Sequence, residues 1–173
     1  MGKPEMETTF RRAEEGDIGL ILQFIRGLAE YEKMLDQVVA TEEILRDWLF
    51  AQKRAEVIFA VADGREVGFA LFFHNFSTFL GRAGIYLEDL YVLPACRGRG
   101  YGKAILRELA HIAVERGCGR LEWACLDWNR PSIDFYLSLG AKPLDDWTVY
   151  RLSGDAMEKL AEAQRAVSGA GLP

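Results

Sequence analysis

The stretch GIYLEDLYVLPACRGRGYGKAIL, Gly84–Leu106, carries most of the information about the fold of this chain. Its first part, Gly84–Leu93, is rich in β-branched and aromatic residues, which predicts a strand that ends at Pro94. Beyond the glycines, apolar residues recur at helical spacing, namely Ile105, Leu106, Leu109, Ile112 and Ala113. The order strand, glycine-rich loop, amphipathic helix indicates an anion site, because the loop and the helix start both direct backbone N–H groups outward.

The glycine loop fits neither of two common phosphate-binding motifs. A Walker loop needs G-x-x-x-x-G-K-[ST], but three residues separate Gly98 from Gly102, and Lys103 is followed by Ala104. The dinucleotide fingerprint G-x-G-x-x-G fails as well, because this loop reads G-x-G-x-G. The loop alone therefore indicates either a diphosphate site at a helix start or a glycine-rich turn with solvated arginines.

The flanking sequence predicts an α/β protein (α+β mixed sheet) with a central mixed β-sheet flanked by helices on both faces. An Asp63-Gly64 turn between two apolar runs predicts a β-hairpin. Helices are expected from Asp17, from a Thr41 cap, from Pro131 to Gly140, and from about Asp155. Further strands are expected over Thr8–Ala13, Arg120–Leu126 and Trp147–Leu152.

Length and composition are those of one globular domain, residues 1–173, with the motifs in about residues 8–152 and a C-terminal helix and tail in 153–173. The last six residues, SGAGLP, are expected to be disordered. A net charge of −5 argues against a nucleic-acid partner and is compatible with a cationic substrate.

Cysteine usage and hydropathy point to the cytoplasm. Three cysteines without CxxC spacing and two histidines make a zinc site improbable, so we expect reduced thiols and no metal. The first ten residues contain no apolar signal-peptide core, Gly2 lacks the Ser or Thr at position 6 that myristoylation needs, and no apolar run is long enough to cross a membrane.

Three segments together carry a family resemblance. The pattern R-x-x-G-x-G (Arg97, Gly100, Gly102) after EDLYVLP resembles the acetyl-CoA loop of the GNAT superfamily of N-acetyltransferases. DWNRPSIDFY resembles the second signature of that superfamily. With LAEYEKMLDQV added, the chain resembles the diamine acetyltransferases, the spermidine/spermine and thialysine group, over about Phe10–Leu152. The resemblance implies the GNAT fold, acetyl-CoA as cofactor, direct attack by a small amine in a ternary complex, and a homodimer.

The resemblance also implies which residues contact the coenzyme. The strand before the loop would bind the pantetheine arm and polarise the thioester carbonyl through its backbone, the loop would hold the diphosphate, and the second signature would add further contacts. These residues are Leu90, Tyr91, Val92, Arg97, Gly98, Arg99, Gly100, Tyr101, Gly102, Lys103, Asn129, Arg130, Pro131, Ser132 and Tyr136.

Two residues are candidates for catalysis. An alkylammonium with a pKa near ~10.4 must lose a proton before it attacks, and Glu88 is the candidate base, directly or through water. By strand alternation Glu88 would share a face with Tyr86, Leu90 and Val92, with Asp89 opposite; the alternatives are a solvent-exposed or ion-paired carboxylate, or a group that only binds the ammonium. Tyr136 matches the general-acid tyrosine of the family, and the alternative is a core tyrosine.

The amine site is implied by the same resemblance. Carboxylates are suited to a substrate with spaced cationic groups. The residues concerned are Tyr31, Glu32, Glu88, Glu122, Trp123, Ala124 and Asp145, although an acidic turn is often a solvated loop and Glu122–Trp123 fits a core strand equally well. The strand sequence EWACL departs from the animal members of the group, which leaves the amine specificity open.

Two other functions remain compatible with the sequence. The acceptor could be a peptide or protein amine, or the chain could bind acyl-CoA without turning it over. A nucleic-acid-binding role for the basic loop conflicts with the net acidity.

Overall fold

The computed structural model describes residues 8–167, which form two compact units that meet in sequence between Ala124 and Cys125. The first unit contains the sheet and helices α1 to α3, and the second contains α4 and α5. No helix within the described residues has the length and apolar character needed to cross a membrane.

The first unit is built on a five-stranded sheet in the order β1-β2-β3-β4-β5. Its strands are β1 (Thr9–Arg12), β2 (Glu56–Ala62), β3 (Arg65–Ser77), β4 (Arg82–Val92) and β5 (Leu121–Trp123). Neighbouring strands are antiparallel except β4 and β5, which are parallel. The mixed sheet predicted from the sequence is thus confirmed.

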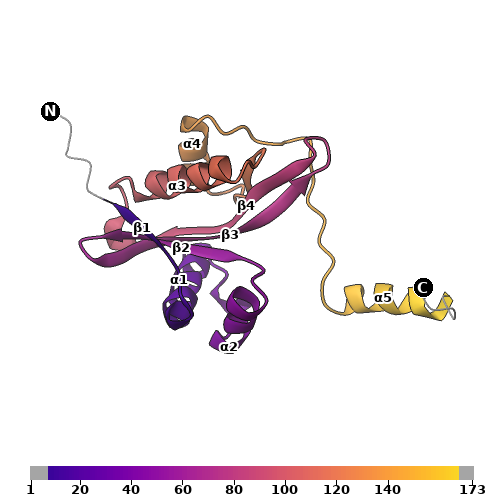
Figure 1. Cartoon of the computed structure of the whole chain (residues 1–173). Coiled ribbons are helices and arrows are strands. Elements are labelled where there is room, and N and C mark those ends of the chain that lie inside the picture. Colours follow the sequence, from indigo (N-terminus) through magenta and orange to yellow (C-terminus); the bar gives the residue numbers. More distant parts are fainter. Residues whose placement is uncertain (1–7, 168–173) are drawn as a thin grey trace. The chain divides into compact units, whose positions relative to one another are not determined.

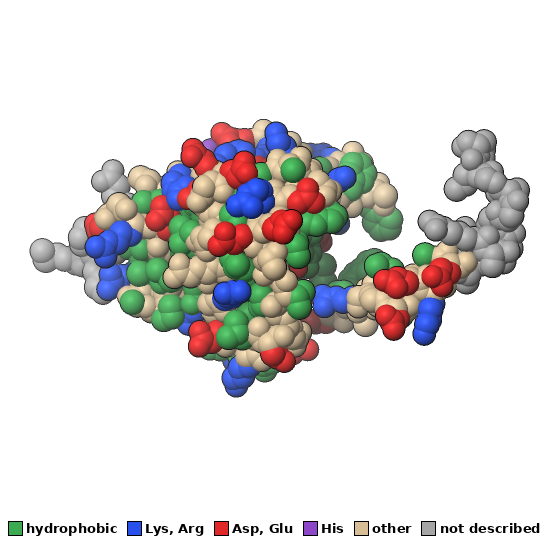
Figure 2. Space-filling view, turned by 90° about the horizontal axis from the view of Figure 1, so that it is seen from below, with side chains coloured by type: hydrophobic (Ala, Val, Ile, Leu, Met, Phe, Trp, Pro, Cys, Tyr) green, Lys and Arg blue, Asp and Glu red, His purple; other side chains and the backbone are tan. Residues whose placement is uncertain are grey.

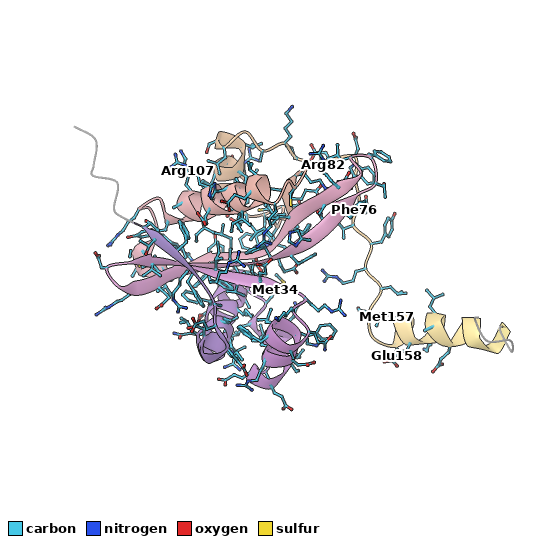
Figure 3. All side chains as sticks on the ribbon, in the orientation of Figure 1. Met34, Phe76, Arg82, Arg107, Met157 and Glu158 are labelled. Carbon is cyan, nitrogen blue, oxygen red and sulfur yellow. The ribbon has the colours of Figure 1, made fainter. Side chains whose placement is uncertain are left out.

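The Asp63-Gly64 turn joins β2 to β3 as predicted. Both residues have positive φ, 51° and 72°. Two left-handed residues in a two-residue connection match the right-handed twist of the flanking strands, which is why Asp-Gly is favoured there. The next hairpin, between β3 and β4, is longer, and Figure 3 shows Phe76 and Arg82 near its distal end.

Helices cover both faces of the sheet, as Figure 1 shows. Helices α1 (Ile18–Tyr31) and α2 (Glu42–Arg46) lie on one face, and α3 (Tyr101–Glu115) lies on the other. Thr41 caps α2 as predicted, because its hydroxyl accepts a hydrogen bond of 3.3 Å from the Ile44 N–H. After α2 the chain continues in a π-helical turn, Asp47–Ala51, and short 3₁₀ turns lie at Glu15–Asp17, Leu35–Gln37 and Pro94–Cys96.

Aromatic packing fixes α1 against the sheet. The Phe24 ring stacks on Phe69 of β3 with 5.2 Å between centroids, and meets Tyr91 of β4 edge-on at 6.0 Å. Phe59 of β2 adds a third ring at 5.9 Å. Such offset and edge-to-face pairs contribute beyond their buried area, so α1 has a defined position over β3 and β4.

Close packing at a glycine fixes α3 on the opposite face. A Cβ atom on Gly68 of β3 would lie 2.8 Å from the Tyr91 carbonyl oxygen and 3.1 Å from Cδ1 of Ile105. Ile105 and Leu109 of α3 are completely buried, whereas Arg107 lies exposed on the outer side of this helix (Figure 3). The start of α3, which carries the glycine loop, is therefore held beside the end of β4.

The second unit contains α4 (Arg130–Ser138) and α5 (Asp155–Val167), both in the predicted positions. The predicted strand over Trp147–Leu152 is wrong: this segment is extended without strand pairing, and Tyr150 is 91% exposed. Its alternating aromatic and β-branched residues favour a strand, but a strand needs a partner edge, and the described part of this unit contains no other strand. The tail predicted to be disordered lies outside the described residues.

Candidate active site

Strand β4 contains a β-bulge at Glu88. Leu87 pairs with Phe72 and Asp89 pairs with Leu71, so two adjacent residues of β3 face three residues of β4. A bulge of this kind reverses the alternation of side chains beyond it. The prediction that Glu88 shares a face with Tyr86, Leu90 and Val92 is therefore wrong, because strict alternation across Glu88 does not hold.

The register shows which side chains do share a face. Tyr86 pairs with Phe73, Asp89 with Leu71 and Tyr91 with Phe69, three alternate residues of β3. Since Phe69 and Tyr91 contact Phe24, this is the face covered by α1. Asp89 thus lies on the α1 face and Glu88 is exposed at the bulge, an arrangement that alternation alone could not predict.

Among the described residues, the last part of β4 is paired with β3 but not with β5. Pairing between β4 and β5 stops at Leu87 and Trp123, whereas β4 continues to Val92. The Leu93 N–H donates to the Val67 carbonyl at 2.9 Å. Because hydrogen bonds alternate along an antiparallel ladder, the backbone groups of Leu90 and Val92 point away from β3 and those of Tyr91 point toward it. Three residues are predicted to bind pantetheine through their backbone. The backbone groups of Leu90 and Val92 point outward at this edge, and those of Tyr91 do not.

The glycine loop leads directly from this edge into α3. Gly98 and Gly100 have positive φ, 72° and 90°, which side-chain-bearing residues rarely adopt. The first hydrogen bond inside the helix runs from the Ala104 N–H to the Gly100 carbonyl, 3.0 Å, so the N–H groups of the preceding turn have no acceptor within the helix. Tyr101 is 3% exposed, and its side chain belongs to the core. At Tyr101 an anion can therefore bind the backbone N–H but cannot contact the side chain.

Two carboxylates, Glu88 and Glu32, lie close enough to Asp89 to affect its pKa. Burial, and after it the negative charges of Glu88 and Glu32, together raise the pKa of Asp89 to about 6. Burial also raises the pKa of Glu32, which caps the C-terminal end of α1. We call Glu32, Glu88 and Asp89 the acidic cluster. A carboxyl whose pKa is raised as that of Asp89 is can bind a cationic group near neutral pH, or accept a proton from it.

Arg97 connects the glycine loop to the end of α1. Its Nε donates a hydrogen bond of 3.0 Å to the Val92 carbonyl. Its guanidinium carbon lies 4.6 Å from the ring centroid of Tyr31 and 5.4 Å from that of Tyr91. Tyr31 is the last residue of α1 and Glu32 follows it. The structure thus brings Tyr31 and the acidic cluster together at the loop end of β4.

Glu122 is held by neighbouring side chains. One of its carboxylate oxygens accepts a hydrogen bond of 2.7 Å from Asn75 and lies 2.8 Å from Nε of Arg120. It pairs in register with Tyr86, while Trp123 pairs with Leu87. A role in amine binding for Glu122, Trp123 and the exposed Ala124 stays a prediction, and Glu122 would have to share its charge with Arg120.

In the second unit, Asn129 organises the start of α4. It is 6% exposed, and its side-chain oxygen accepts a hydrogen bond of 3.4 Å from the Ser132 N–H. Tyr136 is half-buried one turn after Ser132, with its ring 5.4 Å from that of Phe135. The remaining predicted site residues of this unit are Arg130, which forms an i,i+4 ion pair with Asp134 at 3.3 Å, Pro131 in the first turn of α4, and Asp145, exposed in a turn.

Asp89 is the functional candidate that sequence reasoning missed. The signal was present as two adjacent acids, Glu88 and Asp89, in an otherwise apolar strand.

Figure 2, which views the molecule from the side of α1 and α2, shows Lys and Arg side chains interspersed with Asp and Glu on this face, not gathered into a basic surface. Within residues 8–167, no group of three His, Cys, Asp or Glu side chains is arranged to hold a metal ion.

Comparison with known proteins identifies the family. Residues 24–141 match the acetyltransferase (GNAT) family. The chain is 43% identical to thialysine N-epsilon-acetyltransferase of Bos taurus over 163 residues, 87% of this chain and 95% of that protein. It is 32% identical to the human spermidine/spermine N(1)-acetyltransferase-like protein 1 over 162 residues, 87% of this chain but 23% of that longer protein.

A solved structure agrees with this fold. An integron cassette protein from the mobile metagenome of V. cholerae superposes with a TM-score of 0.76 at 29% identity, over 91% of this chain and 99% of that one. The family match extends from α1 through the bulged strand and the glycine loop to the end of α4. The chain therefore belongs to the GNAT family of acetyltransferases.

Proposed function

We propose that this acetyltransferase transfers the acetyl group of acetyl-CoA to a terminal primary amine of a small diamine, polyamine or thialysine-like amino acid, by direct attack in a ternary complex. The observation that carries the proposal is the acidic cluster at the same end of β4 as the glycine loop. Similarity to a thialysine acetyltransferase and to a spermidine/spermine relative supports the same acceptor class.

The residues at the end of β4 fit the coenzyme. Acetyl-CoA supplies an activated acetyl thioester. We assign its diphosphate to the backbone N–H groups from Gly98 to Lys103, with Arg99 and Lys103 exposed beside them as counter-charges. The outward backbone groups of Leu90 and the N–H of Val92, whose carbonyl accepts the Arg97 Nε–H, would bind the pantetheine arm and polarise the thioester carbonyl. Fixed backbone donors need no reorganisation to do this.

The acidic cluster has two tasks in this proposal. Carboxylates attract the protonated amine, and a second cation on the substrate strengthens this attraction. One carboxylate must then accept the proton that the attacking amine loses. Because a base works best when its pKa is near the working pH, Asp89, at about 6, is suited to share the role predicted for Glu88.

Residues of the second unit complete the proposed mechanism. Tyr136 would hold a proton at its phenolic oxygen and donate it to the departing thiolate. Asn129, Arg130, Pro131 and Ser132 would contact the coenzyme at the start of α4. Both assignments rest on the resemblance of DWNRPSIDFY to the second GNAT signature.

An acceptor panel tests the proposal. The protein is incubated with acetyl-CoA and spermidine, linear diamines, thialysine, lysine, ornithine, and peptides with a free N-terminus or lysine, and release of free thiol is followed. We expect turnover with small diamines, polyamines or thialysine. Acetylation of peptides alone would contradict the acceptor class, and tight coenzyme binding by calorimetry without turnover on any acceptor would indicate a binding module.

A homodimer and a cytoplasmic location are part of the same proposal. The homodimer is inferred from the group that the chain resembles, and the cytoplasmic location from its cysteine usage. Light scattering coupled to size-exclusion chromatography would give the mass in solution, with twice the chain mass of 19.5 kDa as the expected result.

A further inference from the structure

Arg97 is positioned differently from a simple diphosphate ligand. Its Nε–H donates to the Val92 carbonyl at 3.0 Å, and its guanidinium carbon lies over the rings of Tyr31 and Tyr91, 4.6 and 5.4 Å from their centroids. Arg99 and Lys103, the other cations of the loop, are exposed, as Arg97 itself is. The charge needed near a diphosphate can therefore come from these two residues, while the Arg97 side chain is engaged with α1 and β4.

The two tyrosines contacted by Arg97 differ in how firmly they are held. The Tyr91 ring is buried against α1 so closely that a Cβ on Gly27 would lie 2.7 Å from the tyrosine oxygen. Phe24 contacts it from the side, with 6.0 Å between ring centroids. Tyr31 is 37% exposed at the end of α1. Arg97 thus bridges a fixed ring and a more exposed one.

This bridge requires the planar shape of arginine. A guanidinium can stack on an aromatic ring while its Nε–H forms an in-plane hydrogen bond, whereas a lysine ammonium is a compact point charge. The bridge also ends one residue before Glu32, a member of the acidic cluster. Any movement of the glycine loop that displaces Arg97 would therefore reach the residues assigned to the amine.

We propose that Arg97 is a positioning residue: it holds Tyr31, and with it the amine-binding end of α1, in register with the coenzyme loop. The inference rests on the proposed function and adds a coupling between its two substrates. Ordering of the loop by the coenzyme would favour the amine site, and by linkage the amine would favour coenzyme binding to the same extent.

The variant Arg97→Lys distinguishes a role in positioning Tyr31 from a role in binding the diphosphate. Arg97→Lys keeps the charge but loses the stack and the Nε–H, so we expect KM for the amine to rise roughly tenfold, with the dissociation constant for coenzyme A changed by less than about twofold. Arg99→Ala is the contrasting variant, because it should raise KM for acetyl-CoA and leave KM for the amine. Far-UV circular dichroism and thermal unfolding confirm that both variants are folded.

A double-mutant cycle with Tyr31 tests the contact itself. Tyr31→Phe keeps the ring and should preserve the effect of Arg97→Lys on the amine KM, whereas in a Tyr31→Leu background that effect should largely disappear. Additive effects in the Tyr31→Leu background would overturn the inference, and so would an Arg97→Lys variant that weakens coenzyme binding as Arg99→Ala does and leaves the amine KM unchanged.

Failure of the positioning role of Arg97 can be distinguished from failure of the proposed function. If no amine in the panel is acetylated, the proposed function has failed, and the same cycle is measured on urea unfolding and on coenzyme A binding by calorimetry. Non-additive unfolding free energies for Arg97→Lys and Tyr31→Leu, with coenzyme affinity preserved in Arg97→Lys, would still support the positioning role. Additive values would overturn it.

Discussion

At the scale of single residues, the acidic cluster depends on one inserted residue in a strand. Sequence reasoning selected Glu88 in this strand because it lies beside the predicted coenzyme loop. It named Glu88 as the candidate base and, from ideal alternation, placed Asp89 on the opposite face of the strand. The bulge at Glu88 instead places Asp89 on the α1 face with a raised pKa. A bulge results from register with a distant strand and cannot be read from local pattern.

The titration of Asp89 predicts the pH dependence of amine use. Below its pKa of about 6 the carboxyl is neutral and neither attracts an ammonium nor accepts its proton. We expect kcat/KM for the amine to fall as the pH drops through about 6. Glu32→Gln removes a negative charge that raises the pKa of Asp89, so this acid limb should move to lower pH. An unchanged or upward-shifted limb in the pH–rate profile would contradict the assignment.

The same carboxyl predicts a stability effect. The pKa of Asp89 is raised in the folded state, so the folded protein favours its protonated form, and this favourable contribution is lost as the pH rises through about 6. Asp89→Asn should therefore stabilise the protein at pH 8 by on the order of 1 kcal/mol, allowing for partial exposure, and have little effect near pH 4. Urea unfolding at the two pH values measures this, and destabilisation at pH 8 would show that Asp89 has a favourable partner.

At the scale of elements, local signals worked where they were sufficient. The Asp63-Gly64 turn, the Thr41 cap and the glycine-opened α3 are each specified by residues in contact with their neighbours in sequence. The segment Trp147–Leu152 has equally strong strand propensity but no strand to pair with in the described part of its own unit. Strand formation depends on a distant partner, and helix caps and tight turns do not.

Close packing at Gly68 predicts how sensitive the site is to the position of α3. A Cβ there would lie 2.8 Å from the Tyr91 carbonyl oxygen, which is backbone and cannot turn aside. Gly68→Ala should therefore lower the free energy of unfolding by about 1–3 kcal/mol and raise KM for acetyl-CoA, since the loop moves with α3. Gly16→Ala is the matched control, because no atom beyond Gly16 and its two chain neighbours lies within 4 Å of the added Cβ. Equal unfolding midpoints for the two variants in urea would contradict this packing argument.

At the scale of the whole molecule, the chain is a GNAT acetyltransferase whose described residues form two units. The sequence identified the family, because three motifs typical of the family occur in the expected order along the chain. It also predicted β4 and the helix α3 that the glycine-rich loop opens. What it missed depended on tertiary structure: the face of Asp89, the side-chain position of Arg97 and the fate of Trp147–Leu152.

The role proposed for Tyr136 links the second unit to catalysis. Tyr136→Phe removes a proton donor but keeps the ring, so kcat should fall at least tenfold while the affinity for coenzyme A changes little. Steady-state kinetics with calorimetry of coenzyme binding measures both quantities. Unchanged turnover across the pH range would show that another group protonates the thiolate.

The central claim is that the acidic cluster selects amines that carry a second cation. The most direct measurement compares kcat/KM for a diamine with that for the monoamine of equal chain length, in the native protein and in Glu32→Gln. We predict that the native protein prefers the diamine at least tenfold and that Glu32→Gln reduces this preference. Equal values for the two amines, or a preference unchanged in Glu32→Gln, would contradict the account.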